Sequence, residues 1–223
     1  MNRTAFDPTL YLVTDAEACG DRGVAATVRD AVAGGVTAVQ LRDQRATTRA
    51  MCRAALELLE VLAGTGVALL VDDRLDVAMA VGADGVHLGQ SDLPVVAARE
   101  IAGRGLVVGW SVTNLAEAEA AAALAPGTVD YLGVGPVFAT ATKADAGPPL
   151  GLDGLRAVCA VSTVPCVAIG GITAARRAQV LAAGASGIAV VSAICAARDP
   201  RAAAEALRGC AAGQAVAEGQ PAR

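Results

Sequence analysis

The stretch ALLVDDRLDVAMAVGADGVHLG, residues 68–89, contains one complete strand–helix–strand unit. Residues 68–72 predict a buried strand, residues 75–81 predict a helix that stops at Gly82, and residues 85–89 predict the next strand. Strands that alternate with helices in this way are typically parallel and are joined by right-handed crossovers. The unit therefore indicates an α/β fold.

The same unit recurs along the chain of 223 residues. Strands are expected at 10–14, 38–42, 68–72, 85–89, 107–112, 131–138, 166–170 and 187–192, and helices at 24–33, 47–63, 75–81, 94–102, 115–124, 152–161, 174–183 and 200–212. Eight such pairs close a barrel, whereas six or fewer would favour an open doubly wound sheet. We therefore predict a single-domain (β/α)8 TIM barrel at 10–212, after an N-terminal segment at 1–9 and before a disordered tail at 213–223. Residues 1–8 are also expected to be loose.

The composition excludes several classes of protein. Hydrophobic residues make up 54% of the chain and aromatic residues only 2%, so aliphatic side chains supply the core. The net charge of −4 argues against a nucleic-acid partner. Glycines 184 and 187 interrupt the uncharged stretch at 178–197, and residues 1–15 lack the apolar run of a signal peptide. No membrane span is expected.

The cysteine pattern indicates a reducing compartment. No C-x-x-C pair occurs, so we expect buried free thiols in a cytoplasmic protein. The six cysteines are Cys19, Cys52, Cys159, Cys166, Cys195 and Cys210. The single histidine, His87, is not bracketed by a cysteine pair, which argues against zinc. The oligomeric state stays open, and a homo-oligomer is compatible with the sequence.

Polar residues at the end of the second predicted strand indicate a ligand site, because barrels of this kind carry their chemistry where strands end. Gln40 and Arg42 are two residues apart and so share a face, while Val39 and Leu41 face the helices. An arginine and a glutamine at the barrel mouth favour an anionic ligand. The alternative is a buried salt bridge between Arg42 and a neighbouring aspartate.

Two carboxylates, Asp73 and Asp92, follow neighbouring strands and are expected to converge. Two carboxylates with phosphate oxygens and water form a typical Mg²⁺ site. Each residue also has a simpler interpretation as part of the entry to the helix that follows it. His87 has a structural role near its strand end or a catalytic one, and we assign it no proton transfer.

The loop after the sixth predicted strand, GPVFATATK (135–143), is long and contains hydroxyl groups and a cation. Thr140, Thr142 and Lys143 suit a phosphate. Lys143 is the only lysine among many arginines, which suggests that a compact ammonium is required there, although chance survival of a surface lysine is the alternative. Gly171 and Ser192, after the next two strands, favour a phosphate grip built from backbone N–H groups.

Six motifs, in order over nearly the whole chain, resemble the thiamine phosphate synthase family. They are LYLVTD (10–15), VQLRD (39–43), VDDRLDVAMAVGADGVHLGQSDLP (71–94), DYLGVGPVFATATK (130–143), AIGGI (168–172) and VSAI (191–194). That family joins 4-amino-2-methyl-5-pyrimidinylmethyl diphosphate to hydroxyethylthiazole phosphate. Diphosphate leaves first, a pyrimidine-stabilised cation forms, and the thiazole nitrogen attacks it.

The resemblance also implies roles for individual residues. Asp73 and Asp92 would bind the cofactor Mg²⁺, and Ser111 would lie near the pyrimidine diphosphate. Thr140 and Thr142 would take the thiazole phosphate together with the backbone at Gly171 and Ser192. The full set implied for the two substrates is Gln40, Arg42, Gln44, Asp72, Ser111, Thr140, Thr142, Lys143, Gly171, Val191 and Ser192, of which Arg42, Ser111 and Lys143 would be catalytic.

Two positions depart from the family pattern and make the site less positive. Gln44 stands where the family usually has lysine, and Asp72 stands where it usually has asparagine. The neighbouring Arg45 is an alternative source of the missing charge. Two other functions remain open, a thiazole tautomerase-like isomerase and a non-catalytic phosphate-binding barrel. The pair Asp73 and Asp92 argues against the isomerase, which needs only proton shifts, while Gln44 and Asp72 would support the non-catalytic barrel.

Overall fold

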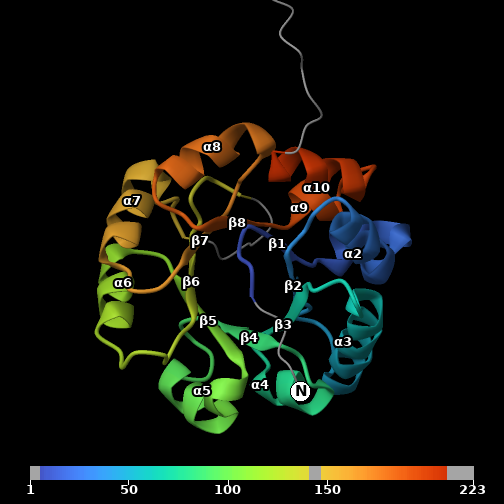
Figure 1. Cartoon of the computed structure of the whole chain (residues 1–223), viewed down its shortest axis with the longest axis horizontal. Helices are drawn as coiled ribbons and strands as arrows, with labels where there is room; N and C mark the ends of the chain where they lie inside the picture. The colour runs from blue at the N-terminus through green and yellow to red at the C-terminus, as the bar shows by residue number, and fades with distance from the viewer. Residues whose placement is uncertain (1–5, 141–146, 210–223) are drawn as a thin grey trace, which may run out of the picture.

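Eight parallel strands close into a barrel in chain order, and helices surround it (Figure 1). The computed structural model describes residues 6–140 and 147–209. The strands are β1 (Leu10–Val13), β2 (Ala38–Leu41), β3 (Ala68–Asp72), β4 (Gly85–Leu88), β5 (Val107–Val112), β6 (Tyr131–Val134), β7 (Cys166–Ile169) and β8 (Gly187–Val190). The helices are α1 (Ala16–Cys19), α2 (Val24–Ala33), α3 (Thr48–Leu62), α4 (Leu75–Val81), α5 (Val95–Ala102), α6 (Leu115–Ala122), α7 (Gly151–Val161), α8 (Ala174–Ala182), α9 (Ser192–Cys195) and α10 (Pro200–Arg208), with short 3-10 turns at Gly20–Arg22 and Gly103–Gly105. The predicted barrel is confirmed.

Most predicted elements lie within a residue or two of the observed ones, but β6 is half the expected length. The strand ends at Val134 because Gly135 and Pro136 follow, and proline has no N–H group with which to continue the ladder. The backbone then bonds to the next strand's end, where the Val137 N–H donates to the Ile169 carbonyl at 2.8 Å. Two short helices, α1 and α9, were not predicted, because a single turn has too few residues to show a period.

Alternate residues of the strands build two separate cores, as the pleat requires. Leu10 and Leu12 of β1 face outward and pack beneath the helices. Tyr11 and Val13 face inward and pack with small residues such as Ala38 and Ala68. The interior is therefore a packed layer of side chains below the mouth of the barrel and not a pore.

A glycine makes room for the largest side chain in this interior. A Cβ added at Gly109 of β5 would lie 2.2 Å from Cζ of Tyr131, which is too close for any side chain. Tyr131 is completely buried, and the register places it beside Gly109. The ring can therefore lie against β5 only because that strand carries no side chain at this point.

Residues 6–8 are not loose, in contrast to the expectation for the N-terminal segment. Phe6 stacks on Tyr131, with ring centroids 4.5 Å apart, and meets Tyr11 edge-on at 5.6 Å. Thr37 Oγ1 donates to the Asp7 carbonyl at 2.9 Å. This segment thus contacts the interior layer and helps to hold the two tyrosines in place.

We expect Phe6→Ala to lower the free energy of unfolding by about 2 kcal/mol, because two aromatic pairs and part of a buried ring are lost. Denaturant unfolding measures the change. Met79→Ala is the matched control, since Met79 is 47% exposed and its loss should change stability by less than about 0.5 kcal/mol. Equal effects of the two variants would show that Phe6 does not stabilise the barrel.

Candidate functional site

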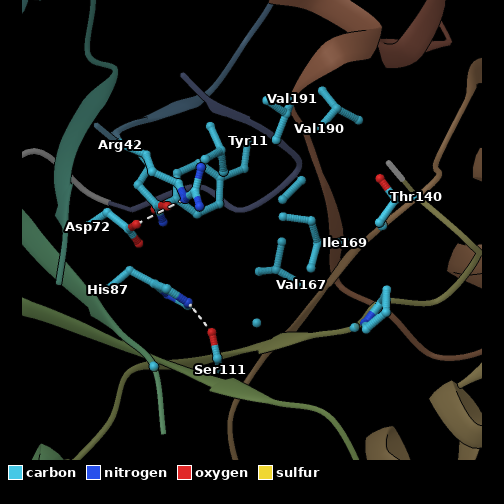
Figure 2. A pocket seen from close by; sticks show the side chains of 18 of the residues that line it. Tyr11, Arg42, Asp72, His87, Ser111, Thr140, Val167, Ile169, Val190 and Val191 are labelled. Carbon is cyan, nitrogen blue, oxygen red and sulfur yellow. Dashed lines mark hydrogen bonds and ion pairs between the residues drawn. The ribbon is translucent and has the colours of Figure 1, made fainter. Parts of the chain in front are cut away.

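A cavity of about 460 Å³ opens at the ends of the strands, where β-strands pass into the loops that follow them (Figure 2). Every predicted site residue that the structure describes lines this one cavity. These residues are Gln40, Arg42, Gln44, Asp72, Asp73, Asp92, Ser111, Thr140, Gly171, Val191 and Ser192. The predictions for Thr142 and Lys143 lie outside the described residues.

An ion pair lies on one side of the cavity. Arg42 follows β2, Asp72 ends β3, and the Nε atom of Arg42 is 3.3 Å from Oδ2 of Asp72 (Figure 2). The two side chains are 19% and 10% exposed. The salt bridge considered as an alternative for Arg42 therefore exists, but both partners also face the cavity. The pairing does not exclude an anionic ligand.

Asp73 has an unusual backbone that presents it to the cavity. Its φ angle is +59°, in the left-handed region that is uncommon for residues other than glycine. The Asp73 N–H donates to the His87 carbonyl at 2.8 Å, which ties it to β4. The N-cap of α4 is Arg74, without a side-chain cap bond, so Asp73 is not the cap of that helix. Strain of this kind is concentrated at functional sites.

Asp92 does not cap a helix either. The N-cap of α5 is Pro94, and no side chain caps that helix. Oδ2 of Asp92 instead accepts the Gly89 N–H at 2.6 Å. A Cβ at Gly89 would lie 2.9 Å from that same oxygen, so the glycine leaves space for the carboxylate to fold back over the end of β4. The simpler interpretations of Asp73 and Asp92 are thus not supported.

The two carboxylates fit a magnesium ion of the kind that binds with a phosphorylated substrate. Within residues 6–140 and 147–209 no group of three or more His, Cys, Asp or Glu side chains could enclose a metal. Mg²⁺ commonly takes one or two protein carboxylates and completes its shell with substrate phosphates and water. Asp73 and Asp92 line the same cavity and offer hard oxygen donors of this type.

A chain of hydrogen bonds crosses the floor of the cavity, and sequence reasoning missed it. Gln40 Nε2 donates to the Tyr11 hydroxyl at 2.9 Å, which is 3.1 Å from the Tyr131 hydroxyl. The Tyr131 hydroxyl is 2.8 Å from Nδ1 of His87. Nε2 of His87 is 2.8 Å from Oγ of Ser111 (Figure 2). The five side chains come from five different strands. The only available signal was that both tyrosines of the chain occupy inward-facing strand positions.

Burial controls the protonation of both tyrosines. Desolvation raises the pKa of Tyr11 above its ordinary value, although its hydrogen bonds with Tyr131 and Gln40 oppose the change. Desolvation also raises the pKa of Tyr131 well above its ordinary value. Both hydroxyl groups therefore keep their protons at neutral pH.

The opposite side of the cavity is formed by loops that approach one another closely. Gly171 has a φ angle of +62°, and a Cβ there would lie 2.6 Å from the Ala139 carbonyl oxygen. The Phe138 N–H donates to the Gly170 carbonyl at 3.1 Å, and Arg176 lies over the Phe138 ring, 4.4 Å from its centroid, while donating to the Gly171 carbonyl. The glycines predicted for a phosphate grip are therefore needed to bring the β6 and β7 loops together.

Apolar side chains line the cavity beside these loops. Val167 and Ile169 come from β7, and Val190 and Val191 come from the end of β8 (Figure 2). In the same view they lie across the cavity from Arg42 and Asp72. The cavity is therefore divided into a charged side suited to phosphate and metal and an apolar side suited to a ring.

The five cysteines within the described residues are free thiols, as expected, but they are not all buried. Cys52 and Cys159 are half-buried, and Cys210 lies outside the described residues. The Cys195 thiol donates to the Val13 carbonyl at 3.7 Å, and the Cys166 thiol donates to the Val164 carbonyl at 3.9 Å. Among the helices of the described ranges, none is both long and apolar enough to cross a membrane.

Fold and cavity together define a (β/α)8 barrel with a polar small-molecule site at the C-terminal ends of its strands. The family model described as thiamine monophosphate synthase matches residues 10–194, and the chain belongs to that family.

A thiamine-phosphate synthase of Albidiferax ferrireducens is 53% identical over 89% of this chain and 90% of its own. A thiamine-phosphate synthase of Chloroflexus aurantiacus is 53% identical over 91% of this chain and 92% of its own. The solved structure of a thiamine phosphate pyrophosphorylase from Pyrococcus furiosus superposes with a TM-score of 0.82 at 41% identity, over 92% of this chain and 95% of that one.

Proposed function

We propose that this protein condenses 4-amino-2-methyl-5-pyrimidinylmethyl diphosphate with hydroxyethylthiazole phosphate to give thiamine phosphate and diphosphate. The observation that carries the proposal is that the predicted site residues within the described ranges, which come from distant parts of the chain, line one cavity. Membership of the family and the names of relatives that span most of the chain support it. The proposed setting is the cytoplasm, and both substrates are small molecules.

The two sides of the cavity suit the two halves of this reaction. Arg42 can donate charge-assisted hydrogen bonds to the diphosphate and stabilise the charge that develops as it leaves. Backbone N–H groups near Gly171 and Ser192, with the Thr140 hydroxyl, can hold the phosphate of the thiazole. Val167, Ile169 and their neighbours can pack against a ring and exclude water from the reacting carbon.

Mg²⁺ held by Asp73 and Asp92 would supply Lewis-acid stabilisation of the diphosphate. No side-chain nucleophile is needed, since the leaving group departs before the new bond forms in the mechanism that the resemblance implies. Lys143 remains a further proposed cation for the same group.

The geometry of the acidic residues favours this function over the two alternatives. A tautomerase would not need a strained aspartate aimed at a cavity that also contains a second carboxylate. A non-catalytic phosphate-binding barrel has no evident use for two carboxylates at that position, since they repel an anion.

Release of diphosphate is the direct test of the proposal. Purified protein would be mixed with both substrates and MgCl₂, and diphosphate and thiamine phosphate would be measured together. We expect equal amounts of the two products and none when the thiazole phosphate is omitted. Diphosphate release without thiamine phosphate would indicate a hydrolase, and no release of either would exclude the synthase.

Gln44 offers a test of the charge balance in the cavity. It lines the cavity, whereas Arg45 is 91% exposed and pairs with the exposed Glu17 at 3.7 Å, so Arg45 does not supply the missing cation. Charge-assisted hydrogen bonds are stronger than neutral ones by about 1 kcal/mol, so Gln44→Lys is expected to raise kcat/KM for the diphosphate substrate several-fold. The gain should shrink as salt is added.

Arg45→Ala is the control for this prediction and should leave kcat/KM unchanged. A loss of activity in Arg45→Ala would instead show that Arg45 reaches the substrate. Unchanged or lower activity in Gln44→Lys would show that the pocket does not require another cation at this position.

A further inference from the structure

The hydrogen-bond chain beneath the cavity has a direction that the chemistry of its members determines. At one end, the amide nitrogen of Gln40 can only donate, so the Tyr11 oxygen accepts. Tyr11 has one hydroxyl hydrogen, which is then given to Tyr131. Tyr131 in turn gives its single hydrogen to Nδ1 of His87. Because Nδ1 accepts, the hydrogen of the neutral imidazole is on Nε2, which donates to Oγ of Ser111.

The opposite direction leaves a buried hydroxyl hydrogen unsatisfied. If Ser111 donated to His87 and His87 donated to Tyr131, the Tyr131 hydrogen would go to Tyr11. The Tyr11 oxygen would then accept two hydrogen bonds, and its own hydrogen would have no acceptor within residues 6–140 and 147–209. Tyr11 is only 2% exposed, so little water reaches its hydroxyl group, and an unsatisfied buried donor is costly.

The neutral state of both tyrosines agrees with this direction. Each must carry its proton to pass a hydrogen bond onward, and burial raises the pKa of both phenols. Each side chain therefore donates its hydrogen bond to the next, and this proton order runs from β2 through β1, β6 and β4 to β5.

We propose that Tyr11, Tyr131 and His87 are positioning residues that fix Ser111 as a hydrogen-bond donor to the ligand in the cavity. His87 Nε2 already carries a hydrogen, so it cannot take the proton of Ser111, and the Ser–His contact is not a nucleophilic pair. The Ser111 oxygen accepts from His87, and its own hydrogen is directed to an acceptor atom in the cavity. This last step rests on the proposed function, in which the acceptor is an oxygen of the diphosphate substrate.

The tautomer of His87 can be measured without any substrate, because it is the only histidine of the chain. Protein labelled with ¹⁵N-histidine and carrying no histidine tag would give one pair of ring-nitrogen resonances. At neutral pH we expect the neutral ring with its hydrogen on Nε2. A ring with its hydrogen on Nδ1, or an imidazolium at that pH, would overturn the proposed proton order.

Substitution of Tyr131 tests what sets this tautomer. Tyr131→Phe keeps the ring but removes the donor to Nδ1, so the hydrogen of His87 should redistribute between the two nitrogens. Tyr11→Phe interrupts the chain one step earlier and should produce a smaller change of the same kind. Phe6→Leu is the matched control, because Phe6 contacts the Tyr131 ring but donates no hydrogen bond, and it should leave the tautomer unchanged. An unchanged spectrum in Tyr131→Phe would contradict the role of Tyr131.

A double-mutant comparison tests whether the chain acts through Ser111. We expect Ser111→Ala and Tyr131→Phe each to lower kcat/KM for the diphosphate substrate about tenfold, and the double variant to be no worse than Ser111→Ala alone. Effects that multiply would show that Tyr131 acts independently of Ser111 and would overturn the positioning role. If the wild type itself lacks synthase activity, the proposed function fails, while the tautomer measurement still decides the proton order.

Discussion

Asp73→Ala and Asp92→Ala are each expected to lower turnover about 1,000-fold, which corresponds to roughly 4 kcal/mol of lost transition-state stabilisation. The physical reason is that these two carboxylates are the proposed oxygen donors to Mg²⁺, and neither has the helix-capping role that would explain it otherwise. The measurement is kcat over a series of MgCl₂ concentrations, with thermal unfolding to show that the barrel is intact.

Asp153→Ala is the matched control for this pair. Its carboxylate is fully exposed, forms an ion pair with Arg156 on the same helix, and does not line the cavity, so turnover should not change. Near wild-type rates in Asp73→Ala or Asp92→Ala at saturating MgCl₂ would show that the metal assignment is wrong.

Asp73→Gly separates strain from function at this position. The φ angle of +59° suits glycine, so this variant should be as stable as the wild type or more stable by up to about 1 kcal/mol. Turnover should nevertheless fall as far as in Asp73→Ala. A variant that gains stability and loses activity would show that the strained backbone is kept for the carboxylate it presents.

The fold could be predicted because each strand–helix unit shows its own pattern in a short window. The alternation of residues 39 to 42 predicted that Gln40 and Arg42 face inward and that Val39 and Leu41 face the helices. This is confirmed, because Val39 and Leu41 belong to the outer core and Gln40 and Arg42 line the cavity. The length of β6 could not be predicted from its apolar run, because it depends on the missing N–H group of Pro136 and on a bond to Ile169 in another strand.

The candidate site could be predicted where a residue's position at a strand end was itself the signal. Asp73 and Asp92 were found in this way, and both line the cavity. The left-handed backbone of Asp73 was not foreseeable, since it results from the bond to the His87 carbonyl on the adjacent strand. The chain from Gln40 to Ser111 was missed for the same reason, because its contacts join strands far apart in the sequence and depend on the space left by Gly109.

Substitution of Arg42, which forms an ion pair with Asp72, is expected to have the second large effect, on both kcat/KM and stability. Arg42→Gln removes the cation proposed for the diphosphate, and the loss of charge-assisted hydrogen bonds of about 1.5–3 kcal/mol predicts a fall in kcat/KM of roughly 100-fold. The same change removes the guanidinium that compensates the charge of Asp72. The free energy of unfolding should therefore fall by about 2 kcal/mol, less than for a fully buried pair, because both side chains keep some contact with solvent.

Adding Asp72→Asn to Arg42→Gln distinguishes the two roles of the arginine. An amide has no charge to compensate, so the double variant should recover most of the lost stability while kcat/KM stays low. Asp72→Asn alone should change kcat/KM only a few-fold, since Arg42 is then free of its partner and still faces the cavity. Denaturant unfolding and steady-state kinetics on the same three proteins make the comparison. If the double variant regained activity together with stability, the function of Arg42 would be to neutralise Asp72, and the diphosphate would have to be held by other groups.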